Sequence, residues 1–210
     1  APGGDSPTVT PGATDPGSGP AENPGGSTGV PGGAGSTGNA GNGGNTTGST
    51  GSGWAGTRVA VIYFSCTGNP RTAAERIRDM TGADLYELTP EQPYTSQDLS
   101  YNNDACRASQ EQKDPAARPR IAGQPLDLSQ YGTIYLGYPI WWGTAPRIIN
   151  TFLDTYDLTG KTIRPFCTSG SSGIETSVAD IRAAAPGVDV TAGLRIADPD
   201  GSDVKAWALG

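Results

Sequence analysis

The sequence predicts an α/β domain in which helices cover both faces of a parallel β-sheet. Continuous apolar runs at 59–64 and 133–138 are typical of strands that are buried on both sides. Each run is followed by apolar residues at helical spacing, at 73–80 and at 146–156. Strands that alternate with helices in this way predict parallel pairing with right-handed crossovers.

The composition divides the chain near Trp54. Residues 1–55 hold 18 of the 32 Gly and 7 of the 18 Pro, and their only charged residues are three acidic ones. Such a segment cannot bury enough apolar surface to offset its ordering entropy, so we expect a disordered Gly/Ser/Pro/Thr-rich tether. A tail without function is the alternative. Residues 56–210 have the length of one domain with a single core.

Charge and hydropathy restrict the partners and the location. The formal net charge is −7 and no basic stripe is present, which argues against nucleic acid as a partner. No apolar run is long enough to span a bilayer. The chain starts at Ala1, and a Gly-rich tail ahead of a compact domain is typical of exported bacterial proteins. We therefore expect a protein tethered to the bacterial cell surface, with a cytoplasmic location as the alternative.

The chain has three cysteines and no histidine. Without histidine, Ser-His-Asp and Cys-His catalysis are excluded and a zinc site is disfavoured. If the protein is exported, we expect a disulfide that uses Cys106, with Cys66 as the favoured partner, because the loop after the second strand should pass the turn after the first. Cys66 and Cys167 end strands that another strand separates, so their backbones should lie about 10 Å apart, which is too far for a direct bridge unless the turns bend inward.

The turn at 65–72 connects the first strand to the first helix. Its hydroxyl, amide and glycine groups could surround a phosphate at the helix N-terminus. The same residue types also serve ordinary helix caps, so the pattern alone leaves both readings open. The groups concerned are Ser65, Thr67, Gly68, Asn69 and Thr72.

A long irregular segment separates the second strand from the third. Gly82 ends the first helix, and 83–88 alternates as an edge strand does. Residues 89–128 are rich in Pro, Asp, Asn, Gln and Ser, with one or two helical turns expected around 104–112. A segment of this length inside a domain is typical of a functional or surface-wrapping loop.

Two further turns follow strands. The strand at 133–138 runs into 139–144, where Trp141 and Trp142 are adjacent and should not both face a core. Thr144 is the expected cap of the helix at 146–156.

The strand at 162–167 opens into the donor-rich turn 168–173, although Pro165 should remove a ladder hydrogen bond from it. A helix at 175–185, an edge strand at 188–194 and a short helix around Trp207 complete the domain. All three turns follow strands at the carboxyl edge, where parallel sheets bind ligands.

These turns resemble those of the flavodoxin family. Residues 65–72 resemble the family's phosphate loop, S/T-x-T/S-G-N-T, with Pro70 where the family usually has Thr. Residues 138–146 and 165–174 resemble a bacterial branch of flavodoxin-like proteins, and the likeness covers about 58–209. It implies a flavodoxin-like three-layer sandwich with a five-stranded parallel sheet in order 2-1-3-4-5, which holds FMN without a covalent bond.

The resemblance also implies a set of cofactor-binding residues. The first turn would hold the phosphate, the second would lie against the ring, with Trp142 or Trp141 stacking on it, and the third would give backbone donors to the ring edge. The set is Ser65, Cys66, Thr67, Gly68, Asn69, Pro70, Arg71, Thr72, Pro139, Ile140, Trp141, Trp142, Gly143, Thr168, Ser169, Gly170, Ser171 and Gly173.

The sequence departs from the family pattern in two places. Pro70 removes an N–H donor and a hydroxyl, which should weaken phosphate binding unless Thr72 or Arg71 compensates. Residues 168–175 contain no aromatic residue to cover the outer flavin face. Either Tyr94 or Tyr101 covers that face, or it is open.

Three functions fit this pattern. We expect an electron carrier that exchanges electrons with a redox partner protein or a small-molecule donor or acceptor. The alternative is an FMN-dependent NAD(P)H or quinone oxidoreductase that uses an open flavin face, and the second alternative is a flavin-free surface interaction module. We prefer the carrier because the sequence shows no basic cluster for the phosphates of a dinucleotide. The oligomeric state stays open.

Overall fold

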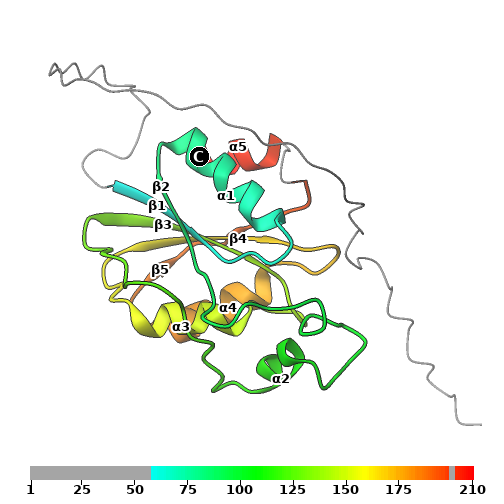
Figure 1. The fold of residues 1–210 in the computed structure, drawn as a ribbon. Coiled ribbons are helices and arrows are strands. Elements are labelled where there is room, and N and C mark those ends of the chain that lie inside the picture. Colours follow the sequence, from blue (N-terminus) through cyan, green and yellow to red (C-terminus); the bar gives the residue numbers. More distant parts are fainter. Residues whose placement is uncertain (1–57, 199–201) are drawn as a thin grey trace, which may run out of the picture. The chain divides into compact units, whose positions relative to one another are not determined.

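A parallel sheet forms the middle layer of the domain (Figure 1) in a computed structural model that describes residues 58–198 and 202–210. The strands lie in the order β2-β1-β3-β4-β5, with β6 also paired to β4, and every pairing is parallel. They are β1 (Arg58–Tyr63), β2 (Asp84–Glu87), β3 (Tyr131–Pro139), β4 (Thr162–Thr168), β5 (Asp189–Val190) and β6 (Leu194–Ile196). The predicted α/β class and order 2-1-3-4-5 are confirmed, whereas the tether expected at 1–55 lies outside the described residues.

Helices cover both faces of the sheet (Figure 1). One face carries α1 (Asn69–Thr81) and α5 (Ser202–Leu209), and the other carries α3 (Arg147–Thr155) and α4 (Glu175–Ala184). Alternate residues of β3 face opposite sides, so Leu136 packs in one apolar core and Tyr135 in the other. The short helix α2 (Arg107–Lys113) belongs to the irregular segment. No helix within the described ranges combines the length and the apolar composition that crossing a membrane requires.

The last edge of the sheet differs from the expectation. A single strand at 188–194 was expected, but the structure divides it into β5 and β6, because Gly193 has a φ of 78°, which no extended strand allows. Pro165 lies opposite this break, and its carbonyl faces Gly193. In an extended strand the N and the C=O of one residue face the same neighbour, so the missing N–H of Pro165 removes no ladder bond.

The N-terminus of α3 differs from the expectation, whereas that of α1 accommodates Pro70. Gly68 caps α1 with a φ of 95°, and Pro70 occupies the second helical position, where the helix itself uses no N–H. Thr144 does not cap α3 as expected, because the helix follows Pro146 and the hydroxyl of Thr144 donates to Asp180 instead.

Candidate functional site

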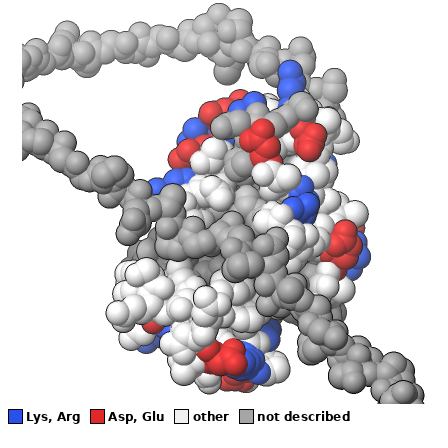
Figure 2. Space-filling model, turned by 90° about the vertical axis from the view of Figure 1, so that its right-hand side faces the viewer, with Lys and Arg blue, Asp and Glu red and all other residues white. Residues whose placement is uncertain are grey.

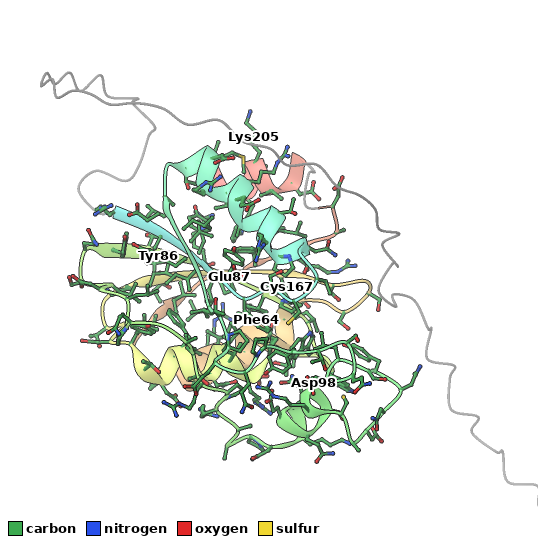
Figure 3. All side chains as sticks on the ribbon, viewed as in Figure 1. Phe64, Tyr86, Glu87, Asp98, Cys167 and Lys205 are labelled. Atoms are coloured by element: carbon green, nitrogen blue, oxygen red, sulfur yellow. The ribbon has the colours of Figure 1, made fainter. Side chains whose placement is uncertain are left out.

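The three predicted turns meet at one edge of the sheet. They follow β1, β3 and β4, which are neighbours and run in the same direction. The N–H of Ile140 donates to the carbonyl of Thr168 at 3.1 Å, which ties the second turn to the third. The rings of Phe64 and Trp141 meet edge to face at 5.4 Å, so the residue that precedes the first turn packs on the second turn. Figure 3 labels Phe64 at the end of β1 and Cys167 near the end of β4.

The first turn presents backbone donors at the start of α1. The N–H of Gly68 donates to Ser65 Oγ at 3.1 Å and so closes the turn. The N–H groups of four other residues find no acceptor among the residues that the structure describes, namely Cys66, Thr67, Asn69 and Arg71. Together with the positive end of the α1 dipole, they form a site that suits an anion.

The two residues expected to compensate for Pro70 are engaged elsewhere. The Nη2 of Arg71 donates to both carboxylate oxygens of Glu87, at 2.8 and 2.9 Å, so the guanidinium is held beside β2. The hydroxyl of Thr72 donates to the carbonyl of Gly68 at 3.3 Å. A phosphate at this turn would therefore be held by backbone N–H groups and by the exposed hydroxyl of Thr67.

The two adjacent tryptophans have different environments. Trp141 is only 7% exposed and packs edge to face against Phe64 and Tyr94, so it belongs to the core. Trp142 is half-buried and has a φ of 44°, and Gly143 follows with a φ of 87°. Trp141 and Thr144 exchange backbone hydrogen bonds across this pair, as in a tight primed turn. Of the two proposed stacking residues, Trp142 is therefore the one on the surface of the site.

Tyr101 stacks on Trp142, and Tyr94 does not cover the site. Their parallel rings lie 4.4 Å apart with an interplanar angle of 10°. The Tyr101 hydroxyl accepts from the N–H of Trp142 at 3.3 Å and donates to the carbonyl of Ile140 at 3.4 Å, although the residue is 59% exposed. The ring of Tyr94 is packed against Phe64 and Trp141, and its hydroxyl donates to Glu111. Of the two tyrosines considered, only Tyr101 is placed at this edge.

An arginine that the sequence analysis did not identify binds the backbone of the third turn. Arg195 lies beside Cys167 in the β4–β6 pairing, and its Nη2 donates to the carbonyls of Ser169 and Gly170 at 3.1 and 2.7 Å. The expected strand at 188–194 ended one residue before Arg195. The contacts of Arg195 could have been predicted only if the break of the strand at Gly193 had been predicted first.

The expected Cys66–Cys106 disulfide is not formed, and all three cysteines are free. Cys106 is buried as the N-cap of α2, where its sulfur accepts from the N–H of Ser109 at 3.4 Å. Its side chain thus turns into its own helix, whereas Cys66 is exposed in the first turn. Although Cys66 is exposed as a residue, the groups around its thiol desolvate it and raise its pKa to about 12. Desolvation also raises the pKa of the buried Cys167 thiol to about 12.

We expect three thiols per chain to react with a disulfide reagent in denaturant without reductant, because no bridge is present. The native protein should react slowly at neutral pH, since the raised pKa of Cys66 leaves little of its thiolate, and faster as the pH rises towards 12. A count of one thiol in denaturant would contradict the structure on this point.

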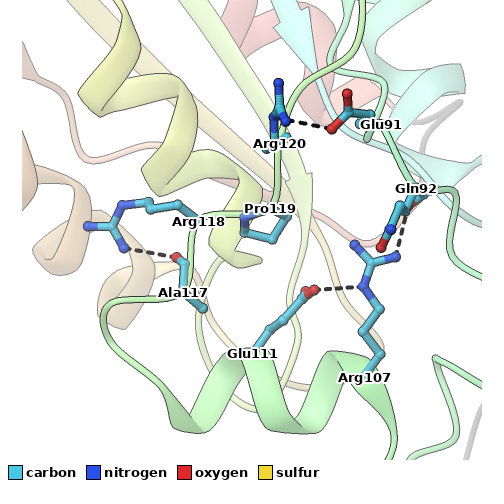
Figure 4. A pocket seen from close by; sticks show the side chains of 8 residues that line it. All are labelled: Glu91, Gln92, Arg107, Glu111, Ala117, Arg118, Pro119 and Arg120. Carbon is cyan, nitrogen blue, oxygen red and sulfur yellow. Dashed lines mark hydrogen bonds and ion pairs between the residues drawn. The ribbon is translucent and has the colours of Figure 1, made fainter.

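No residue of the three turns lines either of two cavities of about 440 Å³. One is beside α2 (Figure 4), where Arg107 and Arg120 pair with Glu111 and Glu91 at 2.7 and 3.1 Å, so its charges are largely neutralised. The other is lined by residues around Tyr156 and Lys161. On the uncovered part of the face in Figure 2, acidic and basic side chains are intermixed. The described residues contain no cluster of metal-ligating side chains.

Comparison with known proteins identifies the family. The family model described as Flavodoxin matches residues 58–208. A candidate flavoprotein from Bacteroides eggerthii DSM 20697 is 42% identical over 72% of this chain and 95% of its own, with a TM-score of 0.69. A second, from Bacteroides uniformis ATCC 8492, is 38% identical over 74% and 99%, also with a TM-score of 0.69.

A flavoprotein from Lactobacillus acidophilus NCFM, solved in complex with FMN, shares the fold at 23% identity, with a TM-score of 0.57 over 72% of this chain and 99% of its own. No curated protein matches. Because the family model spans most of the chain and agrees with the strand order, the chain belongs to the flavodoxin family.

Proposed function

We propose that the domain binds FMN without a covalent bond at the carboxyl edge of the sheet and acts as an electron carrier. The observation that carries this proposal is the meeting of three turns with complementary groups. The first offers unpaired N–H groups at a helix N-terminus, the second an accessible indole at Trp142, and the third an exposed segment at 170–171. The FMN complex of the Lactobacillus relative supports the choice of ligand.

The residues present fit the three parts of FMN. The phosphate would lie on the N–H groups of Cys66, Thr67, Asn69 and Arg71, which have no acceptor among the described residues. The ring would lie against Trp142, because a flat apolar ring is best buried by a flat apolar partner. The third turn would donate from its backbone to the polar ring edge. Bound FMN would supply the redox chemistry.

Backbone strain supports the role given to Trp142. A large side chain with a φ of 44° costs on the order of 1 kcal/mol or more and persists only where the surroundings enforce it. Strain of this kind concentrates at ligand sites, and here it places the indole outward while Trp141 stays in the core.

The arrangement of charges favours a carrier over an NAD(P)H oxidoreductase. The basic side chains described near this edge already have partners: Arg71 pairs with Glu87, Arg107 with Glu111, and Arg195 with backbone carbonyls. Phosphates of a dinucleotide would have to displace these partners. Tyr101 also lies on the exposed side of Trp142, where it restricts access. The redox partner would be a protein or a small molecule that approaches the exposed edge.

A titration and a reduction assay test the proposal. We expect the purified protein to take up one FMN per chain and to quench its fluorescence. Under anaerobic conditions, NADH and NADPH alone should reduce the bound flavin slowly, whereas dithionite or a reduced partner protein should reduce it fully. Rapid reduction by either nucleotide would show an oxidoreductase instead, and a failure to bind FMN would favour the flavin-free interaction module.

A further inference from the structure

Arg195 is a charged residue whose position the family resemblance did not assign. It lies in β6, whose pairing places it beside Cys167, one residue before the end of β4. Within the described ranges it pairs with no carboxylate, unlike Arg71 or Arg107. Its Nε is buried and finds no hydrogen-bond partner there. A buried guanidinium donor without a partner costs free energy, so a second role is expected of it.

The contacts of Arg195 fix the orientation of two peptide groups. Its Nη2 donates to the carbonyl of Ser169 at 3.1 Å and to that of Gly170 at 2.7 Å. In a trans peptide the C=O and the N–H point in opposite directions, and the described residues contain no cis bond. The N–H groups of Gly170 and Ser171, which belong to these two peptides, therefore point away from the guanidinium.

These two N–H groups are available to a ligand. Neither donates to an acceptor among the residues that the structure describes, and both residues are exposed. The positive charge behind the two carbonyls also polarises the peptides, which makes their N–H groups stronger donors. Adjacent backbone N–H groups that point to the same side are a common way to bind negative charge or a carbonyl oxygen.

We propose that Arg195 is a positioning residue for the FMN ring: it aims the N–H groups of Gly170 and Ser171 at the polar ring edge, and its charge, which no described carboxylate neutralises, favours the reduced cofactor. This rests on the proposed function, because the ligand is the same FMN. Reduction adds negative charge to the ring, and a nearby cation with no carboxylate partner stabilises that charge. The residue would thus raise the reduction potential without touching the ring.

The test uses three variants of the full chain. Arg195→Gln removes the charge, and Arg195→Lys keeps it but loses the flat guanidinium that reaches two carbonyls at once. The matched control is Arg182→Gln. Two nitrogens of Arg182 also donate to a backbone carbonyl, that of Val190, at 3.0 and 2.9 Å, but this carbonyl belongs to β5 and not to the third turn. Each protein is measured for backbone dynamics without FMN, for the Kd of oxidised FMN, and for the midpoint potential.

The three measurements separate geometry from charge. Backbone order parameters of Gly170 and Ser171 should fall from about 0.85 to below about 0.6 in both Arg195 variants. In Arg195→Gln, the Kd of reduced FMN should rise on the order of tenfold more than the Kd of oxidised FMN. This difference corresponds to a midpoint potential lower by about 30 mV for the two-electron couple. In Arg195→Lys, the binding of oxidised and of reduced FMN should weaken equally, so the midpoint potential should stay near that of the wild type. Arg182→Gln should change none of these values.

Each failure has its own signature. Unchanged order parameters in both Arg195 variants would overturn the positioning role, whether or not FMN binds. An unchanged potential in Arg195→Gln would overturn the role of the charge, and if that variant does not fold, Arg195→Lys still tests the positioning role through the order parameters. A wild-type protein that keeps an ordered turn but binds no FMN would instead contradict the proposed function.

Discussion

Replacing Gly137 by valine should lower the free energy of unfolding by about 3 kcal/mol or more. Gly137 lies in β3 directly beside Phe166 in β4. A Cβ at position 137 would lie 2.2 Å from Cζ and 2.5 Å from Cε2 of that ring. Phe166 is fully buried, so its ring has no free space into which to move, and overpacking of this kind costs 1–3 kcal/mol or more. Urea denaturation followed by circular dichroism measures the loss.

Two control variants separate the clash from a general effect of losing glycine. Gly173→Ala should be nearly neutral, because its Cβ would meet the carboxylate of Glu175, which is on a flexible exposed side chain. Gly137→Ala should cost about 1–3 kcal/mol alone and less in a Phe166→Leu background, where the ring atoms are gone. Equal costs in both backgrounds would show that Phe166 is not the cause.

The sequence predicted the sheet well because β1 and β3, two neighbouring strands inside it, are largely apolar runs. Runs such as 133–138 have one interpretation in a chain of alternating strands and helices, and the order then follows from the family. The edge strand was harder, since Val188 to Leu194 alternates well enough to suggest one strand. Only the close approach of Gly193 to Pro165 shows why the chain must break there.

The candidate site was predictable in position but not in detail. Three strand-ending turns had to meet at one edge, and they do. The contacts that shape the site join residues far apart in the chain. Tyr101 and Trp142 are 41 residues apart, and Arg195 reaches Ser169 across 26. Local pattern contains no information on such pairs, because they depend on the path of irregular segments such as 89–128.

We expect Trp141 to contribute mainly to the stability of the fold and Trp142 mainly to FMN binding. Trp141→Ala and Trp142→Ala should therefore have opposite effects on these two quantities. Trp141 fills the core between Phe64 and Tyr94, so its removal should cost about 3–5 kcal/mol of unfolding free energy. Trp142 is only partly buried at the edge of the core and stacks on Tyr101, so its loss should cost about 1 kcal/mol, partly offset because alanine crowds less at a φ of 44°.

FMN affinity should show the reverse order. Trp142→Ala should weaken binding by about 1–3 kcal/mol, roughly 5- to 150-fold in Kd, because stacking and burial of the ring are both lost. Trp142→Phe is the matched control, since it keeps a flat apolar surface and should recover part of the affinity. Denaturation curves and FMN fluorescence titrations on the same samples give both quantities. If Trp142→Ala and Trp141→Ala bound FMN as tightly as the wild type, the ring would not lie at this turn, and the proposed site would be wrong.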